Sequence, residues 1–140
     1  GIHLRGGWGV TWADVDLDGD PDLLTSGGLY INETPEKDKG HWIQLRAIGN
    51  VSSNYAALGA TIRVTTGDMT RIRHVGGGTG QGCQDSLTTH FGLGEAEEID
   101  VIVVSFPAGE TVTYPGPFSV DQRMKLFEDG TTAVYGPENP

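Results

Sequence analysis

Five aspartates occupy every second position between residues 14 and 22, in the run Asp14-Val-Asp-Leu-Asp-Gly-Asp-Pro-Asp22. Ca²⁺ takes six to eight hard oxygen ligands at roughly 2.3–2.6 Å, and a short loop supplies them by curling its acids around the ion. Gly19 falls where such a loop must turn sharply. Asp20 is expected to offer its backbone carbonyl, and the other aspartates their carboxylates. The run therefore predicts a calcium site with the ligands Asp14, Asp16, Asp18, Asp20 and Asp22.

The loop differs from a complete EF-hand. Its twelfth position is Thr25 instead of a bidentate Glu, and Pro21 disfavours a helix after the loop. The flanking segments 8–13 and 22–25 are predicted strands. A solvated acidic turn is the alternative, but five carboxylates would then repel one another without compensation. Mg²⁺ suits the loop less well because it demands tighter octahedral geometry. Since free Ca²⁺ is abundant outside the cytosol, we expect a secreted, extracellular or periplasmic protein.

Length and charge limit the other classes of protein. The chain has 140 residues, enough for one domain with a small appended unit. Lys and Arg number 9 against 19 Asp and Glu, and the net charge of -10 disfavours nucleic acid and anionic membrane as partners. No run of about 18 apolar residues is present, so membrane insertion is not expected. Cys83 is the only cysteine, which excludes an intrachain disulfide. Because the chain starts at Gly1 without a Met or signal sequence, we expect a fragment of a longer parent chain.

The rest of the chain, which holds the loop in place, is predicted to consist of strands. Apolar and polar residues alternate over residues 43–47 and 58–64, the period of a half-buried strand. The run Ile99 to Phe106 is apolar on both faces and predicts a central strand. Gly-containing turns around residues 67, 109 and 130 predict consecutive antiparallel hairpins. Weaker strands are predicted at residues 71–75, 87–91, 110–114 and 123–128.

These signals together predict an all-β fold, an antiparallel, jelly-roll-like β-sandwich with an N-terminal calcium-loop hairpin. The polar run before Gly40 lacks periodicity and is interpreted as a linker. The expected organisation is a hairpin unit over 1–34, a linker over 35–40 and a sandwich over 41–136. The glycine-rich stretch 76–82 is expected to be a turn-rich loop, because neither Lys-Ser/Thr nor a helix follows it.

Two resemblances follow from these motifs. The run from Trp8 to Leu24, followed by Gly28-Leu-Tyr-Ile-Asn32, resembles one FG-GAP/VCBS-type repeat, a family of calcium-binding propeller blades. His41-Trp-Ile-Gln-Leu-Arg46 and Leu58-Gly-Ala-Thr-Ile-Arg-Val64 resemble the ASPIC/UnbV domain, as do His90-Phe-Gly-Leu-Gly94 and Phe106-Pro-Ala-Gly109. The second resemblance covers residues 41 to about 129. It implies secretion and a role in adhesion or extracellular recognition, and it supplies no catalytic residue.

The predicted function is a non-catalytic, calcium-stabilised extracellular recognition module that binds carbohydrate. The exposed aromatic ligand-binding residues are expected to be Tyr55 and Tyr114, which lie in or beside polar turns. A basic stripe of Arg63, Arg71 and Arg73 on one sheet face is a further hypothesis, for an acidic glycan. The alternative is a structural or protein-interaction domain of a secreted adhesion-type protein, with an extracellular protein as partner and no small ligand.

Catalysis is not expected. Cys83 with His74 or His90 would need a third orienting residue, which the sequence does not mark.

Overall fold

The computed structural model describes residues 9–35, 38–78 and 80–136, and within them the chain is all-β. The strands are β1 Val10–Ala13, β2 Asp22–Thr25, β3 Gly28–Tyr30, β4 His41–Ile48, β5 Thr61–Thr66, β6 Met69–His74, β7 Thr89–Gly94, β8 Glu98–Ser105, β9 Thr111–Ser119, β10 Gln122–Phe127 and β11 Thr132–Val134. No helix in this part of the chain is long and apolar enough to cross a membrane.

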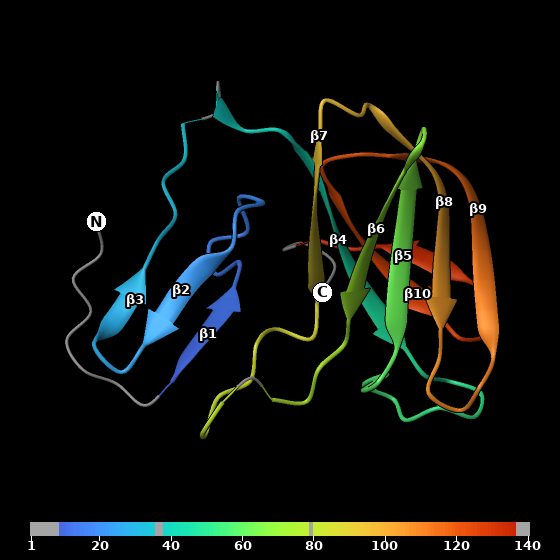
Figure 1. Cartoon of the computed structure of the whole chain (residues 1–140), viewed down its shortest axis with the longest axis horizontal. Coiled ribbons are helices and arrows are strands. Elements are labelled where there is room, and N and C mark those ends of the chain that lie inside the picture. The colour runs from blue at the N-terminus through green and yellow to red at the C-terminus, as the bar shows by residue number, and fades with distance from the viewer. Residues whose placement is uncertain (1–8, 36–37, 79, 137–140) are drawn as a thin grey trace.

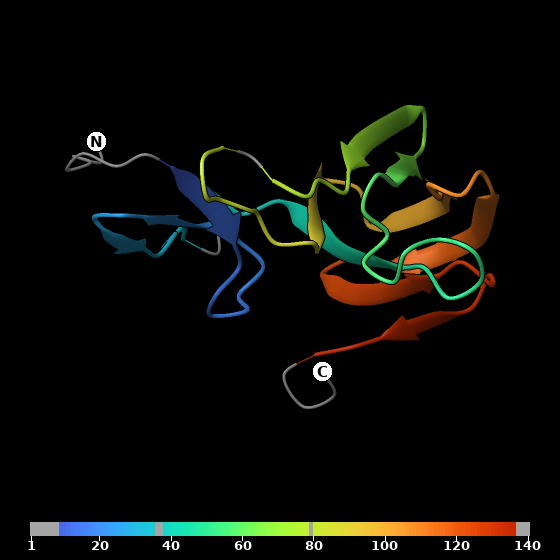
Figure 2. The ribbon, with the colours of Figure 1, turned by 90° about the horizontal axis from the view of Figure 1, so that it is seen from below.

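Two four-stranded sheets form the larger body of the molecule (Figure 1). One has the order β11-β10-β4-β7 and the other the order β6-β5-β8-β9. The predicted central strand is confirmed, because β8 has a neighbour on each side. Figure 2, turned by 90°, shows the two sheets as stacked layers, so the β-sandwich prediction is confirmed.

One pairing departs from the expected antiparallel pattern. The strand β10 pairs with β4 in parallel, from Gln122 beside Ile43 to Phe127 beside Ile48. The three predicted hairpins are present as β5–β6, β8–β9 and β10–β11. Hairpin turns fix only the pairing of strands that are neighbours in sequence. The strands β4 and β10 are separated along the chain by β5 to β9, and they pair because both bury the same face of their sheet.

The core lies between the two layers. Strand residues whose side chains point inward are fully enclosed, among them Ile43 and Leu45 of β4, Ile62 of β5 and Ile102 of β8. Inward and outward residues alternate along β5 in the pattern that the sequence predicts. Burial of this apolar surface is the main term that stabilises the sandwich.

The third sheet, β1-β2-β3, lies beside the sandwich and not within it (Figure 1). The loop between β6 and β7 extends from the sandwich to β1. There the Ser86 amide donates to the Trp12 carbonyl at 2.9 Å, and the Trp12 amide donates to Asp85 Oδ1 at 2.9 Å. The outer edge of β1 is thereby joined to the sandwich by backbone and side-chain hydrogen bonds.

Candidate metal centre and adjoining cleft

The loop between β1 and β2 gathers three of the five predicted ligands. One carboxylate oxygen from each of Asp14, Asp16 and Asp18 lies within 4.8 Å of the others. This is the only such group of acidic, His or Cys side chains among the described residues. A cluster of hard oxygen atoms at this spacing can hold a cation.

Backbone amides shape the loop around these carboxylates. The Asp20 amide donates to Asp18 Oδ1 at 2.9 Å, and the Gly19 amide donates to Asp14 Oδ2 at 3.0 Å. Gly19 has a φ of 98°, which glycine adopts without steric cost, as the sequence predicts for the sharp turn. Leu17 also has a positive φ, 68°, so the curl of the loop is maintained at one non-glycine position as well.

Asp14 connects the loop to the sandwich. Its Oδ2 accepts hydrogen bonds from Gln44 Nε2 at 2.6 Å and from Arg123 Nη2 at 2.7 Å. The Asp14 side chain is only 5% exposed, yet its Oδ1 has no hydrogen-bond partner among the described residues. Because a buried carboxylate oxygen without a partner is costly, this atom fits the ligand position that a bound cation would use.

Asp22 lies at the base of the loop and is 1% exposed. Its two oxygens accept the backbone amides of Val15 at 2.7 Å and of Asn32 at 2.8 Å. The structure therefore gives Asp22 a role in holding the loop closed, and it lies outside the group of three converging carboxylates. The sequence placed Asp22 at the end of the loop, but it did not indicate which backbone amides would donate to its carboxylate.

Lys39 lies beside the outer part of the loop. Its Nζ is 2.9 Å from Asp18 Oδ2 and 3.1 Å from Asp20 Oδ2. Hydrogen bonds from the Asp20 amide and from Lys39 lower the pKa of Asp18, and the two carboxylates raise the pKa of Lys39. The pKa of Asp16 is raised, because desolvation and the neighbouring Asp18 carboxylate disfavour its charged form. Lys39 neutralises part of the negative charge that the aspartates of the loop concentrate.

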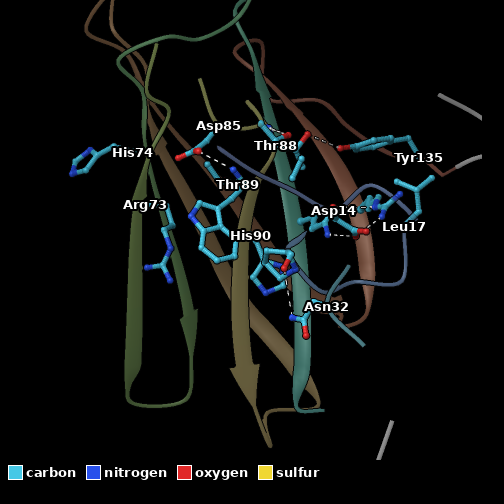
Figure 3. A pocket seen from close by; sticks show the side chains of 16 residues that line it. Asp14, Leu17, Asn32, Arg73, His74, Asp85, Thr88, Thr89, His90 and Tyr135 are labelled. Carbon is cyan, nitrogen blue, oxygen red and sulfur yellow. Dashed lines mark hydrogen bonds and ion pairs between the residues drawn. The ribbon is translucent and has the colours of Figure 1, made fainter. Parts of the chain in front are cut away.

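A cleft of about 700 Å³ opens between the carboxylate loop and the sandwich (Figure 3). Figure 3 shows Arg73 and His74 on one wall, Asp14 and Leu17 on the opposite wall, and His90 between them. Trp12, Asn32, Thr88 and Tyr135 also line it. Both the N-terminal sheet and the sandwich therefore contribute to one concave site, which sequence reasoning missed because its walls come from distant segments.

His90 connects the cleft to the loop. Its ring stacks on Trp42 at a centroid distance of 6.3 Å, and Trp42 packs against Gly19 of the loop. Burial lowers the pKa of His90, so its imidazole is neutral at pH 7. No hydrogen bond within the described residues uses either ring nitrogen, and Nδ1 is enclosed by protein atoms.

The predicted aromatic ligand residues have different environments. Tyr55 is 73% exposed in the loop after β4, as expected. The prediction that Tyr114 is exposed is wrong: it is 2% exposed, and its hydroxyl donates to the Phe127 carbonyl at 2.6 Å. Its neighbours Pro115 and Gly116 indicated a turn, but the residue lies within β9 and points into the core between the layers.

The basic stripe is also corrected. Residues directly opposite in β5 and β6 share a face, and Arg71 and Arg73 pair with the buried Val64 and Ile62. Arg63 pairs with Ile72 and lies on the other face. The three arginines therefore do not form one stripe, because the observed pairing register of β5 and β6 differs by one residue from the register that a common stripe would require.

The other chemical candidates are separate from the loop. Cys83 Sγ lies 3.6 Å from the Gln81 carbonyl oxygen, and His74 Nδ1 lies 2.9 Å from Thr61 Oγ1. Trp8, expected to begin the first strand, lies outside the described residues.

Two stacked four-stranded sheets, with a carboxylate loop docked on one end, define a β-sandwich domain with an appended candidate metal site. The sequence profile of the ASPIC and UnbV family matches residues 50–133, more than half of the chain. The protein belongs to the ASPIC and UnbV family. The match covers β5 to β10 and leaves the carboxylate loop outside it. No curated protein matches the chain.

Proposed function

We propose that the protein is a non-catalytic, calcium-stabilised extracellular recognition module that binds carbohydrate. The observations that carry the calcium part are the convergence of Asp14, Asp16 and Asp18 and a buried Asp14 oxygen that has no hydrogen-bond partner among the described residues. All the donors are hard oxygens, the ligand type of Ca²⁺. The carboxylate run and its flanking strands support an FG-GAP/VCBS-type repeat ahead of the sandwich, and family membership is consistent with secretion.

Calcium in this loop would act mainly on structure. It would neutralise carboxylates that otherwise repel one another, and it would hold Asp14 in the position from which it contacts Gln44 and Arg123. A ligand that binds only the folded state stabilises it by about 2.7 kcal/mol at a concentration 100 times its Kd. The ion is therefore expected to stabilise the docking of the N-terminal sheet as well as the loop.

The test is thermal unfolding of the chain with calcium and then with EDTA. Calcium is expected to raise the unfolding midpoint of the wild type by several degrees. It should leave the midpoint of Asp16→Ala unchanged, because this variant lacks one of the three converging carboxylates. Tyr55→Ala is the matched control and should respond to calcium like the wild type, because Tyr55 lies in a distant loop. If calcium does not change the unfolding midpoint of the wild type, the proposal that the loop binds calcium is rejected.

A protein-interaction role without a small ligand is the second candidate. Large apolar side chains that are more than 40% exposed gather on the N-terminal sheet, and they include Leu24 and its cross-strand neighbour Leu29, with Ile31 just after β3. Isolated exposed apolar residues are ordinary, but a cluster on a three-stranded sheet favours a protein partner. A glycan array probed in calcium separates the two roles: an array with no binding to the wild type rejects carbohydrate and leaves the interaction role.

A further inference from the structure

We infer that the cleft between the carboxylate loop and β7 is a binding site for an uncharged oligosaccharide, with Trp12 as the stacking platform and His90 as a hydrogen-bonding residue. The inference rests on the proposed carbohydrate function and places it at residues that the sequence did not mark. The cleft volume, about 700 Å³, lies in the range of about 300–1,000 Å³ that small-molecule sites occupy.

Trp12 provides a rigid aromatic surface on one wall. Its side chain is 47% exposed and lines the cleft, although its backbone is held on both sides by hydrogen bonds to Asp85 and Ser86. An indole on an anchored backbone contributes large apolar contact area at low entropic cost. The C–H face of a pyranose ring is the matching apolar surface on a sugar.

His90 provides a polar group without a partner. Its Nδ1 is enclosed and has no hydrogen-bond partner among the described residues. A buried N–H without an acceptor is costlier than an unused acceptor, so the ring proton belongs on Nε2. The imidazole of His90, which lines the cleft, then carries one N–H donor that we expect a ligand in the cleft to use, and the ring is stacked on Trp42.

The charges on the walls favour an uncharged ligand. Two guanidinium groups and two carboxylates line the cleft, from Arg73, Arg123, Asp14 and Asp85, and their formal charges cancel. Arg123 is paired with Asp14 at 2.7 Å. Arg73 donates to the Ile72 carbonyl at 3.0 Å and its guanidinium carbon lies 5.5 Å from the centre of the Phe91 ring. The net charge of -10 on the chain further disfavours an acidic polysaccharide.

Hydroxyl and amide groups also line the cleft beside these four balanced charges. The Thr88 and Tyr135 hydroxyls lie 3.2 Å apart on one side of the cleft, and Asn32 lies near the loop. A small number of directional polar groups around one aromatic surface matches a ligand that carries many hydroxyls and no charge.

The experiment measures binding of neutral disaccharides to the whole chain in calcium. Cellobiose, maltose, mannobiose and N,N'-diacetylchitobiose serve as probes in isothermal titration, with digalacturonic acid as the charged comparison. Trp12→Ala and His90→Phe are each expected to weaken binding of the best neutral probe by about tenfold or more. Val51→Ala should weaken it by less than about twofold, because Val51 is 68% exposed and does not line the cleft. The His90→Phe substitution keeps an aromatic ring next to Trp42 and removes the two ring nitrogens.

A second measurement covers the case in which Trp12→Ala does not fold. In a nitrogen-edited NMR titration of the wild type, the best neutral probe should shift the Trp12 indole signal and the His90 amide signal, and leave the Val51 amide signal in place.

Each outcome decides a separate point. Binding that is unaffected by both cleft variants, with no shift at Trp12 or His90, overturns the cleft and leaves the proposed carbohydrate function standing. Tighter binding of digalacturonic acid than of every neutral probe overturns the uncharged class. No binding of any saccharide, on an array or in titration, rejects the proposed carbohydrate function itself.

Discussion

Asp14 illustrates how one side chain can serve both the loop and the sandwich. One of its oxygens accepts hydrogen bonds from Gly19, Gln44 and Arg123, whereas the other has no partner among the described residues. The side chain of Arg123 is 7% exposed, so the ion pair between the two residues is almost fully shielded from water. Removal of one partner of a buried pair leaves the other charge uncompensated.

Asp14→Ala is therefore expected to destabilise the fold even without metal. The expected loss in free energy of unfolding is about 3–5 kcal/mol, the usual result when one partner of a buried pair is removed. Denaturant unfolding in EDTA measures it. Asp16→Ala is the matched control, because Asp16 is exposed and should change stability in EDTA by no more than about 0.5 kcal/mol. Equal losses in the two variants would contradict the anchoring role of Asp14.

Glu128 holds the loop that follows β4. The Glu128 carboxylate is 5% exposed and accepts the backbone amides of Val51, Ser52 and Ser53, together with two serine hydroxyls. Burial alone would raise the pKa of Glu128, but the hydrogen bonds, first those from Ser53, outweigh it and lower the pKa to about 2. The same loop carries the exposed Tyr55.

The lowered pKa of Glu128 gives a pH prediction. A carboxyl whose folded pKa lies below its unfolded value contributes stability above the unfolded pKa of 4.5, and this contribution is lost as the pH falls toward about 2. Glu128→Gln should lower the thermal midpoint at pH 6, and the difference from the wild type should shrink as the pH falls. Thermal unfolding from pH 6 to pH 2 measures this difference. A constant difference across that range would contradict the assignment.

At the scale of elements, the loop is fitted to β4 through a glycine. A Cβ on Gly19 would lie 2.3 Å from Cε2 of Trp42, and the Gly19 φ of 98° is strained for other residues. Trp42 belongs to β4 and stacks on His90 of β7, so the loop, β4 and β7 are in continuous contact. A side chain at position 19 would separate the loop from the sandwich.

Gly19→Ala is expected to cost more than backbone strain alone. Strain at a positive φ costs about 1 kcal/mol, and overpacking against a ring adds about 1–3 kcal/mol. Gly67→Ala is the matched control, because Gly67 has a φ of 55° and no atom within 4 Å of an added Cβ. Denaturant unfolding of both variants gives the comparison. A cost at Gly19 no larger than that at Gly67 would show that the contact with Trp42 does not constrain the loop.

In the whole molecule, hydrogen bonds among the described residues join the N-terminal sheet to the sandwich at two places. The loop residue Asp14 bonds to β4 and β10, and β1 bonds to the segment that precedes β7. The cleft lies between these two connections. An ion bound at the proposed site would therefore stabilise residues far from the loop in sequence.

Hydrogen exchange tests this connection. Calcium is expected to slow amide exchange in β4 and β10 as well as in residues 14–22, because Asp14 contacts Gln44 and Arg123. Amides of β6 are the internal comparison, since β6 lies in the other sheet. A change confined to residues 14–22 would show that the loop and the sandwich are not energetically coupled.

Features that depend on near neighbours along the chain could be predicted from the sequence. Alternating residues placed the strands, glycines marked the hairpin turns, and the spacing of the aspartates brought Asp14, Asp16 and Asp18 together. These patterns follow from local backbone geometry, and the structure confirms the strands, the hairpins and the converging carboxylates. The family resemblance over the sandwich is confirmed for residues 50–133, and the resemblance to an FG-GAP/VCBS repeat stays a prediction.

Features that depend on distant segments became evident only from the folded structure. The parallel pairing of β4 with β10, the burial of Tyr114 and the separation of Arg63 from Arg71 and Arg73 all follow from register and layer packing. The cleft is the clearest case, because Trp12, Arg73 and His90 are far apart in the chain and meet only when the N-terminal sheet docks on the sandwich. Sequence spacing carries no information on such contacts, since they are set by how whole sheets pack.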